Sequence, residues 1–452
     1  MKRTIQSLIF IAVTLLTTNI FAQSWQLVGP VGFTSFNAKY TNIAFNNNDE
    51  PYVVFSDGSV NAKASVMKFD GSNWVYVGTA GFSQGIADYT DIAFDNNGTP
   101  YVAYSDHANN DNVTVMKFDG SSWVAVGNVG FSTGEPYYNS LAINSNGVPY
   151  VVFQDATSLS KATVMKFDGN SWVVVGTAGF SSVSVKEPTI AIDNNNTPYV
   201  AFTQWGGLYN ASVMKFDGSN WVNVGPVGFT TNSADYASLA FSNSGEPYMA
   251  FIDGTQNSHV SVMKFNGSSW ALVGNAGFST GTSHYPSLAF SNTGEPYVAF
   301  KSSFNNSQAT VMKYDGSAWV AVGSTGFSSG WADYTSLAFN SSGVPYVAFE
   351  DINNSYRATV MKFGNGTSSI NSMAADNSIE VYPNPANDYL NLTNLPVGAN
   401  IKINDAIGKN VYDASITTKE TSINTSAFTN GIYHICIEKD GVLINKKLVI
   451  NK

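Results

Sequence analysis

The sequence predicts an all-β protein, a seven-bladed β-propeller with four-stranded blades followed by a small C-terminal β-sandwich. Three landmarks recur every 49 residues with no insertion or deletion between the tryptophans, which are Trp25, Trp74, Trp123, Trp172, Trp221, Trp270 and Trp319. A Pro-Tyr pair recurs from Pro51-Tyr52 to Pro345-Tyr346, and a Val-Met-Lys-aromatic run recurs from 66–69 to 360–363. Periods of about 20 to 50 residues are typical of solenoids, arrays and propellers, and the strand count per unit distinguishes them.

The unit from Tyr89 to Gly127 contains four short strands. They cover residues 89–95, 100–104, 113–118 and 123–127. The Asn97-Gly98 pair favours a tight hairpin between the first two, and Asp119-Gly120 turns the chain between the last two. Proline opens the second strand, where its missing donor costs little. One unit is therefore a twisted antiparallel sheet of two hairpins joined by a variable loop.

Sheets of four short strands must stack to bury both faces, and radial stacking gives a propeller. A small residue recurs in the first strand of every copy, from Ala44 to Ala338, so we place this strand innermost. The array begins with a fourth-type strand at 24–29 and ends with a third-type strand at 357–363. We expect these two segments to hydrogen-bond and complete blade seven, since an open solenoid would leave both edges unpaired.

The repeated side chains favour packing over ligand binding. Large apolar side chains that recur at one strand position, the Trp, Met and Phe columns, fill the space between blades. The lysine of each Val-Met-Lys run, from Lys68 to Lys362, alternates away from the methionine. We expect this lysine to be a solvated charge that protects a sheet edge.

Composition excludes several classes of function. Of 452 residues, 44% are apolar and only 12% are charged, and the net charge is −10. Such a surface repels phosphate backbones and anionic lipid, so we expect no nucleic-acid partner. Cys436 is the only cysteine and the four histidines share no repeat position, so we expect no intrachain disulfide, no cofactor and no metal site built from cysteines. A metal held by Asp and Asn oxygens of the loops stays open, although no EF-hand or nonapeptide calcium repeat is present. Cys436 itself is interpreted as a small buried apolar residue.

The chain divides into four segments. Residues 1–22 have Lys2-Arg3, an apolar stretch and a small residue at Ala22, which is the pattern of a secretory signal peptide. The repeats fill 24–363, and a Gly/Ser/Asn-rich linker covers 364–376. Residues 377–452 alternate as short strands. No segment after the signal peptide is long and apolar enough to span a bilayer.

Short motifs mark the segment 377–452. These include the Tyr-Pro-Asn-Pro run, a Gly-Lys pair, a Gly-Ile-Tyr run and the Lys-Lys-Leu-Val-Ile ending; the residues concerned are Pro383, Asn384, Pro385, Gly408, Gly431, Tyr433, Lys446 and Lys447. In order and spacing they resemble the type A C-terminal sorting domain of the type IX secretion system of Bacteroidetes. The resemblance implies export to the periplasm, interaction with the type IX machinery, and release or attachment at the outer cell surface.

Catalytic motifs are missing from the sequence. It has no phosphate-binding glycine loop, no zinc-protease run and no nucleophile elbow. The Asp-Gly-Ser-x-Trp hairpins resemble the Asp-box turns of sialidase-type propellers, with one residue of difference in spacing. Arg3 and Arg357 are the only arginines, too few for the arginine triad of that family. Two carboxylates from different blades would still suffice for a glycosidase.

Variation between the repeats points to binding. The loops between strands two and three emerge on the same face as those between blades, and repeat-to-repeat variation gathers there. Trp205 and Trp331, the two tryptophans outside the 49-residue series, fall in these loops. Exposed aromatic rings next to Asp, Asn and Gln suit sugar recognition by stacking and hydrogen bonding. One loop position holds a carboxylate in most blades, with the residues Asp57, Asp106, Asp155, Gln204, Asp253, Ser302 and Asp351. Either a loop-capping hydrogen bond or a ligand contact explains it, and capping is the simpler explanation.

We therefore expect a secreted or cell-surface protein without enzymatic activity that binds a glycan, with blade-related sites adding avidity. Trp205, Trp331, Asp57, Asp106, Asp155, Gln204, Asp253 and Asp351 are the candidate ligand-binding residues. A protein-binding adhesion scaffold is the alternative, and a glycoside hydrolase is the second alternative.

Overall fold

The computed structural model describes residues 23–134, 136–365, 379–405, 410–439 and 442–452. Residues 23–364 form one compact unit, and the described residues from 379 onward belong to a second. The expected signal peptide, residues 1–22, lies outside the described residues, as do the linker residues 366–376.

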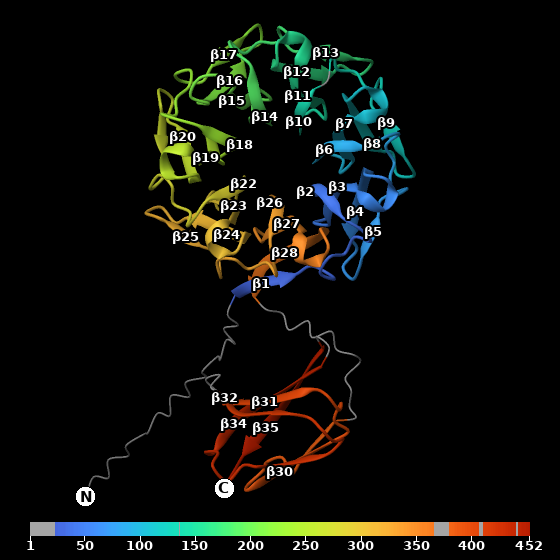
Figure 1. The fold of residues 1–452 in the computed structure, drawn as a ribbon, viewed down its shortest axis with the longest axis vertical. Helices are drawn as coiled ribbons and strands as arrows, with labels where there is room; N and C mark the ends of the chain where they lie inside the picture. The colour runs from blue at the N-terminus through green and yellow to red at the C-terminus, as the bar shows by residue number, and fades with distance from the viewer. Residues whose placement is uncertain (1–22, 135, 366–378, 406–409, 440–441) are drawn as a thin grey trace, which may run out of the picture. The chain divides into compact units, whose positions relative to one another are not determined.

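The first unit is a ring of seven four-stranded antiparallel sheets, as the repeat predicted (Figure 1). Blades one to three are β2 (Ala38–Phe45), β3 (Pro51–Asp57), β4 (Lys63–Phe69) and β5 (Trp74–Tyr76); β6 (Ala87–Phe94), β7 (Pro100–Asp106), β8 (Asn112–Phe118) and β9 (Trp123–Ala125); and β10 (Tyr137–Ile143), β11 (Pro149–Asp155), β12 (Lys161–Phe167) and β13 (Trp172–Val174). Blades four to six are β14 (Val185–Ile192), β15 (Pro198–Gln204), β16 (Ala211–Phe216) and β17 (Trp221–Asn223); β18 (Ala234–Phe241), β19 (Pro247–Asp253), β20 (His259–Phe265) and β21 (Trp270–Leu272); and β22 (Ser283–Phe290), β23 (Pro296–Ser302), β24 (Gln308–Tyr314) and β25 (Trp319–Ala321).

Blade seven closes the ring with a strand from the other end of the repeat array. It consists of β26 (Ala332–Phe339), β27 (Pro345–Asp351), β28 (Arg357–Asn365) and β1 (Gln23–Leu27), with β1 paired to β28. Beyond β1 the pairing continues, because Val28 N donates to Val360 O at 2.9 Å and Phe33 N to Ala358 O at 2.9 Å. The predicted closure is confirmed, and the first strand of each blade is the innermost (Figure 1).

The tryptophan column joins each blade to the one before it. The indole Nε1 donates to a backbone carbonyl of the preceding blade, in Trp74–Val28, Trp123–Val77, Trp172–Val126, Trp221–Val175, Trp270–Val224 and Trp319–Val273. Trp25 makes the same bond to Val322 O at 2.7 Å and stacks on Phe327 with ring centroids 4.0 Å apart. The seam between the two ends of the array is therefore built like the other six interfaces.

The lysine column is less solvated than the sequence suggested. Lys68 Nζ lies 2.7 Å from Glu50 Oε1, and Lys313 Nζ lies 2.9 Å from Glu295 Oε1. The lysine also lies over the tyrosine of the Pro-Tyr pair, with Lys68 Nζ 5.9 Å from the centre of the Tyr52 ring. These contacts join the third strand of a blade to the second. The lysines therefore pack against the tyrosine rings in addition to carrying charge.

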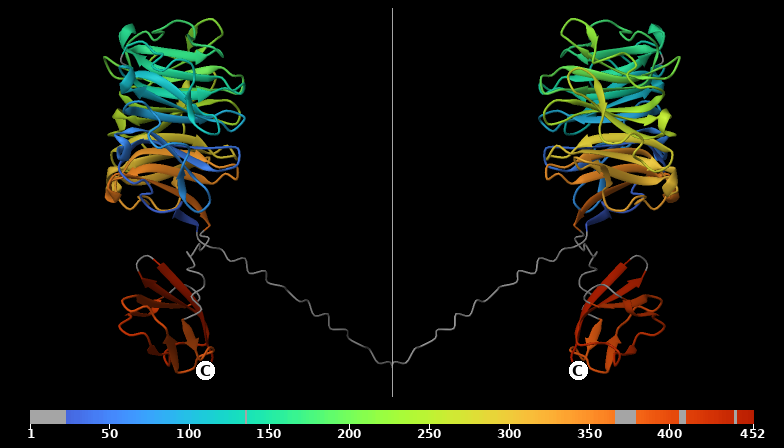
Figure 2. Two further views of the ribbon diagram at one scale, coloured as in Figure 1. Left: turned by 90° about the vertical axis from the view of Figure 1, so that its right-hand side faces the viewer. Right: turned by 90° about the vertical axis from the view of Figure 1, so that its left-hand side faces the viewer.

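Edge-on, the strands of each blade run between two faces that carry different connections (Figure 2). Ala38 pairs with Asp57 and Phe45 with Pro51, so the start of the innermost strand lies beside the end of the second. The loops between second and third strands and those between blades therefore share one face, the loop face, as expected. The short hairpins occupy the opposite face. Six of the loops contain a turn of 3₁₀ helix: η1 (Gly58–Val60), η2 (His107–Asn109), η3 (Ala156–Ser158), η4 (Gly254–Gln256), η5 (Ser303–Asn305) and η6 (Ile352–Asn354).

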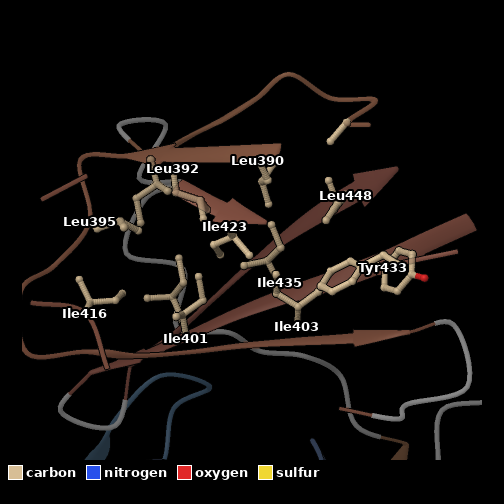
Figure 3. Packing of buried hydrophobic residues seen from close by; sticks show 14 of the residues in the cluster. Leu390, Leu392, Leu395, Ile401, Ile403, Ile416, Ile423, Tyr433, Ile435 and Leu448 are labelled. Atoms are coloured by element: carbon tan, nitrogen blue, oxygen red, sulfur yellow. The ribbon is translucent and has the colours of Figure 1, made fainter. Parts of the chain in front are cut away.

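The second unit is the predicted small β-sandwich. One sheet contains β29 (Glu380–Tyr382), β30 (Tyr389–Thr393) and β33 (Thr421–Asn424); the other contains β32 (Asn410–Ser415), β31 (Asn400–Asp405), β34 (Gly431–Lys439) and β35 (Val442–Ile450). Leu390 and Ile423 from the first sheet meet Ile403, Ile435 and Leu448 from the second in one buried cluster (Figure 3). Cys436 on β34 is half-buried, and burial raises the pKa of its thiol.

The ring-closing contact gives a stability prediction. Trp25→Phe keeps an aromatic ring beside Phe327 but removes the indole donor, so we expect a loss of about 1 kcal/mol of unfolding free energy. Trp25→Ala also removes the stacked area, and we expect a loss of about 3 kcal/mol. Denaturant unfolding followed by fluorescence measures both. Trp205→Ala, which removes an exposed ring, is the control and should change stability by less than about 0.5 kcal/mol. A Trp25→Ala protein as stable as this control would refute the proposed importance of the closure.

Candidate binding face

The carboxylates of the loop position lie inside their own loops. Asp57 is buried and caps η1, accepting hydrogen bonds from Ser59 N at 2.9 Å and Ser65 Oγ at 2.9 Å. Asp106, Asp155 and Asp253 make the same kinds of contact, and Asp351 accepts from Ser329 Oγ at 3.0 Å. In blade four Gln204 fills the position and donates to Ser212 Oγ at 2.8 Å. Helix capping accounts for the aspartates of four blades, whereas Asp351 makes no cap bond and bonds Ser329 instead. Ligand contact by the side chains at this position stays a prediction.

Trp205 borders a cleft between blades three and four. Its loop contains no 3₁₀ turn, and Gly206 and Gly207 take positive φ values of 109° and 83° there. Trp205 N donates to Ser184 O at 2.7 Å, and its side chain stays 50% exposed. Tyr137, Tyr138, Gln154, Ser160, Ser184 and Trp205 line a cavity of about 280 Å³. This loop conformation, unlike that of the other six blades, creates an aromatic-walled cleft.

Trp331 lies in a different environment, directly before β26 of blade seven. It is also 50% exposed, and Lys301 Nζ lies 5.7 Å from the centre of its ring. Lys301 is ion-paired with Asp333 and lies 5.9 Å from the Tyr285 ring. Trp205 and Trp331 thus belong to separate parts of the loop face, on blades four and seven, and the structure does not bring them together.

A ring of tyrosines narrows the central channel, and sequence analysis missed it. Its members are Tyr40, Tyr89, Tyr138, Tyr236, Tyr285 and Tyr334, with Glu187 at the equivalent position of blade four. Each has a positive φ between 51° and 55°, at a bulge in the innermost strand. Neighbouring rings touch, as in Tyr40 and Tyr89 with centroids 5.0 Å apart. These residues and the polar side chains below them line a cavity of about 430 Å³. The tyrosine's 49-residue spacing was the signal that could have revealed it.

Three carboxyl groups near the channel have raised pKa values because they are shielded from water. Burial raises the pKa of Asp91 to about 6 although Leu141 N and Ser140 Oγ donate to it. Burial also raises the pKa of Glu187, which is 9% exposed and accepts from Tyr236 N at 2.6 Å. Burial, reinforced by Asp333, raises the pKa of Glu350 to about 7, and the residue is 3% exposed.

Glu350 occupies a position where three other blades place a side chain that donates a hydrogen bond to the next blade. The equivalent side chains of Ser105, Gln154 and Thr203 donate to the first innermost-strand carbonyls of the next blade, at 3.2, 2.5 and 2.5 Å. A carboxylate cannot donate, and Glu350 Oε1 is buried without a hydrogen-bond partner. Burial and the nearby Asp333 disfavour the charged form of this carboxyl group, and its protonation would restore a donor at this position.

The described sorting-signal residues lie on β34 and β35 or against β35. Asn384 Nδ2 donates to Lys447 O at 2.8 Å, and its Oδ1 accepts from Val449 N at 2.9 Å, so the Pro383-Asn384-Pro385 turn is held against β35. Tyr433 on β34 donates to Thr429 O at 2.9 Å. Gly431 and Lys446 lie on β34 and β35. Gly408 lies outside the described residues.

Comparison with known proteins confirms the nature of the second unit. Residues 380–451 match the family described as secretion system C-terminal sorting domain. These residues are therefore a type IX sorting domain, and the chain is a protein exported to the outside or the cell surface. A search of curated proteins found no match. In the described residues no helix has the length and apolar character needed to cross a membrane, and no cluster of three or more His, Cys, Asp or Glu side chains has the geometry of a metal site.

Solved structures share the propeller fold at low sequence identity. A polysaccharide lyase, an ulvan lyase, is 14% identical, with a TM-score of 0.50 over 75% of this chain and 95% of its own. PorZ, a surface component of the type IX secretion system of Porphyromonas gingivalis, is 15% identical with a TM-score of 0.48. That alignment covers 94% of this chain, which spans 61% of the length of PorZ. The Aleuria aurantia lectin is 16% identical with a TM-score of 0.43, over 67% of this chain and all of the lectin.

Glu350 gives a pH-dependent prediction. Its pKa is about 7 in the folded protein against 4.5 for an ordinary glutamate, so the folded state holds a proton that the unfolded chain releases. The stability that this group contributes is full below about pH 4.5 and is lost as the pH rises through 7. Glu350→Gln should therefore be more stable than the natural protein at pH 8 and equal to it near pH 4. Thermal unfolding across this range tests the difference, and a constant gap at all pH values would contradict it.

The clamp made by Asn384 gives a prediction about export. Asn384→Ala removes two hydrogen bonds between the turn and β35, each contributing at most about 1 kcal/mol. We expect faster amide hydrogen exchange at Val449 and a lower secreted fraction, with precursor retained in cells that carry the secretion system. Lys419→Ala, which truncates an exposed side chain of the same unit, should be exported normally. Normal export of Asn384→Ala would show that the clamp is dispensable for sorting.

Proposed function

We propose that the propeller is a carbohydrate-binding domain that acts outside the cell after export by the sorting domain. The observation that carries the proposal is the cleft beside Trp205, where an exposed indole lies next to tyrosine, amide and hydroxyl side chains. Aromatic rings stack on the apolar faces of sugars, and neutral polar groups bond their hydroxyls. Trp331 offers a second exposed ring on the same face.

We propose binding without catalysis. The carboxyl groups with raised pKa values are Asp91, Glu187 and Glu350, and none of them lines the cleft beside Trp205. A general acid or base must come within hydrogen-bonding distance of the reacting group. Similar structures include both a polysaccharide lyase and a lectin, so their fold does not distinguish binding from catalysis.

A protein-binding adhesion scaffold is the second candidate, and one observation favours it. Leu159, Leu208 and Phe304 are exposed at the loops between second and third strands of blades three, four and six. Leu159 and Leu208 come from neighbouring blades, and exposed apolar side chains that lie close together are typical of protein interfaces. These three residues lie on the loop face together with Trp205, so a protein partner would compete with a glycan there.

A glycan array tests the proposed function. We expect the secreted protein to bind a defined subset of glycans, and Trp205→Ala to lower that affinity at least tenfold, because stacking on one aromatic ring contributes about 1–2 kcal/mol. Leu159→Ala is the control on the same face and should bind normally. Unchanged glycans after incubation would accord with binding alone, whereas cleavage that depends on Glu350 would establish an enzyme. Absence of glycan binding, with a protein recovered through Leu159, Leu208 and Phe304, would favour the adhesion scaffold.

A further inference from the structure

The mouth of the channel on the loop face carries one column in which six of the seven side chains are acidic or basic. It lies directly before the tyrosine ring and consists of Lys39, Asp88, Tyr137, Lys186, Asp235, His284 and Asp333. Several of these charges are paired across blades, as in Lys186 with Asp235 at 3.7 Å. Tyr137 of blade three is the single exception in the column. Its ring is 53% exposed, and it lines the cleft beside Trp205.

Trp205, the other large aromatic residue of the cleft, also differs from the residues at the equivalent positions of the other blades. Trp205 corresponds to Gly58, His107, Ala156, Gly254, Ser303 and Ile352 in the other blades, so an indole stands at this position only in blade four. The two aromatic walls come from neighbouring blades and have no paired counterpart elsewhere in the ring. Two independent departures from the repeat therefore converge on one cavity of about 280 Å³.

Every side chain that lines this cavity is neutral. Gln154 is buried, and its Nε2 donates to Val185 O at 2.5 Å, which fixes the carboxamide in the lining of the cavity. Ser184 Oγ donates to Leu159 O at 2.8 Å, and its oxygen can still accept a hydrogen bond. Among the residues that the structure describes, no lysine or arginine lines the cavity to pair with a carboxylate or sulfate, and the whole chain has a net charge of −10. An anionic ligand would lose its hydration there without gaining an ion pair.

We infer that the cleft between Tyr137 and Trp205 is a selective site for one uncharged hexopyranose unit and discriminates against uronic acid and sulfated sugars. This inference rests on the proposed function and specifies its ligand class. The ring of the sugar stacks on the aromatic walls, and its hydroxyls reach Gln154, Ser160 and Ser184. Selectivity comes from the absence of a compensating charge, because a buried anion without a partner is disfavoured.

Matched pairs of neutral and acidic sugars test the inference. Galactobiose is compared with digalacturonate, and cellobiose with a cellobiuronate, by calorimetric titration of the full exported protein. We expect at least one neutral member to bind and its acidic counterpart to bind at least tenfold more weakly. Trp205→Ala and Tyr137→Ala should each weaken neutral binding at least tenfold, while Tyr137→Phe, which keeps the ring, should retain it. Phe36→Ala, which removes a 60% exposed ring from a loop between blades outside the cleft, should bind like the natural protein.

Three outcomes would overturn the inference. Acidic sugars that bind as tightly as neutral ones with the same dependence on Trp205 would refute the selectivity and leave carbohydrate binding intact. Neutral binding that is lost in Trp331→Ala but kept in Trp205→Ala would place the site elsewhere on the loop face. If no sugar on the glycan array or in the titrations binds, the proposed function fails along with the ligand class. Circular dichroism and thermal unfolding of each variant establish that a loss of binding is not a loss of fold.

Discussion

The contact on which the propeller depends is the interface between consecutive blades, repeated around the ring. At each interface an indole Nε1 reaches across to the backbone carbonyl of the preceding blade, and the ring stacks on a phenylalanine. A four-stranded sheet has no interior of its own, so each blade is stable only between two neighbours. Closure by β1 supplies the last neighbour, because Trp25 bonds Val322 O as the other tryptophans bond their partners. This repeated packing holds in place the blades that carry the loops of the loop face.

The repeat made the scaffold predictable from sequence, since period, strand number and strand order follow from side chains that occur seven times. The positions of Trp205 and Trp331 on the loop face followed from the same logic. Their environments did not, because these depend on side chains that are distant in sequence. Tyr137 and Gln154 lie 68 and 51 residues before Trp205 along the chain (205 minus 137 and 205 minus 154) yet line the same cleft. The loop aspartates could be named from sequence, but only their contacts showed that they form hydrogen bonds within the loops.

The tyrosine ring was missed for a different reason. Regular alternation predicts which face of a strand each residue takes, but the innermost strands contain a bulge at the tyrosine, where φ is positive. The bulge turns the tyrosine side chain into the channel. It also interrupts the alternation of side chains from which the faces of the strand were predicted. Positive φ at a bulky residue is costly and persists only where surrounding structure enforces it. Here adjacent tyrosine rings contact one another around the channel and help to enforce this backbone conformation. The ring centroids of Tyr285 and Tyr334, for example, are 4.9 Å apart.

A binding site that is present once in the ring requires residues that differ from the repeat. The cleft beside Trp205 combines two such departures and has no sequence counterpart in the other blades, so one propeller offers one such cleft instead of seven. A small neutral site without an ion pair is expected to bind in the millimolar range, about −4 kcal/mol. Blade-to-blade multivalency therefore cannot supply avidity at this cleft. Avidity would have to come from repeated sugars on a polymer engaging many copies of the protein, which surface display after export would provide.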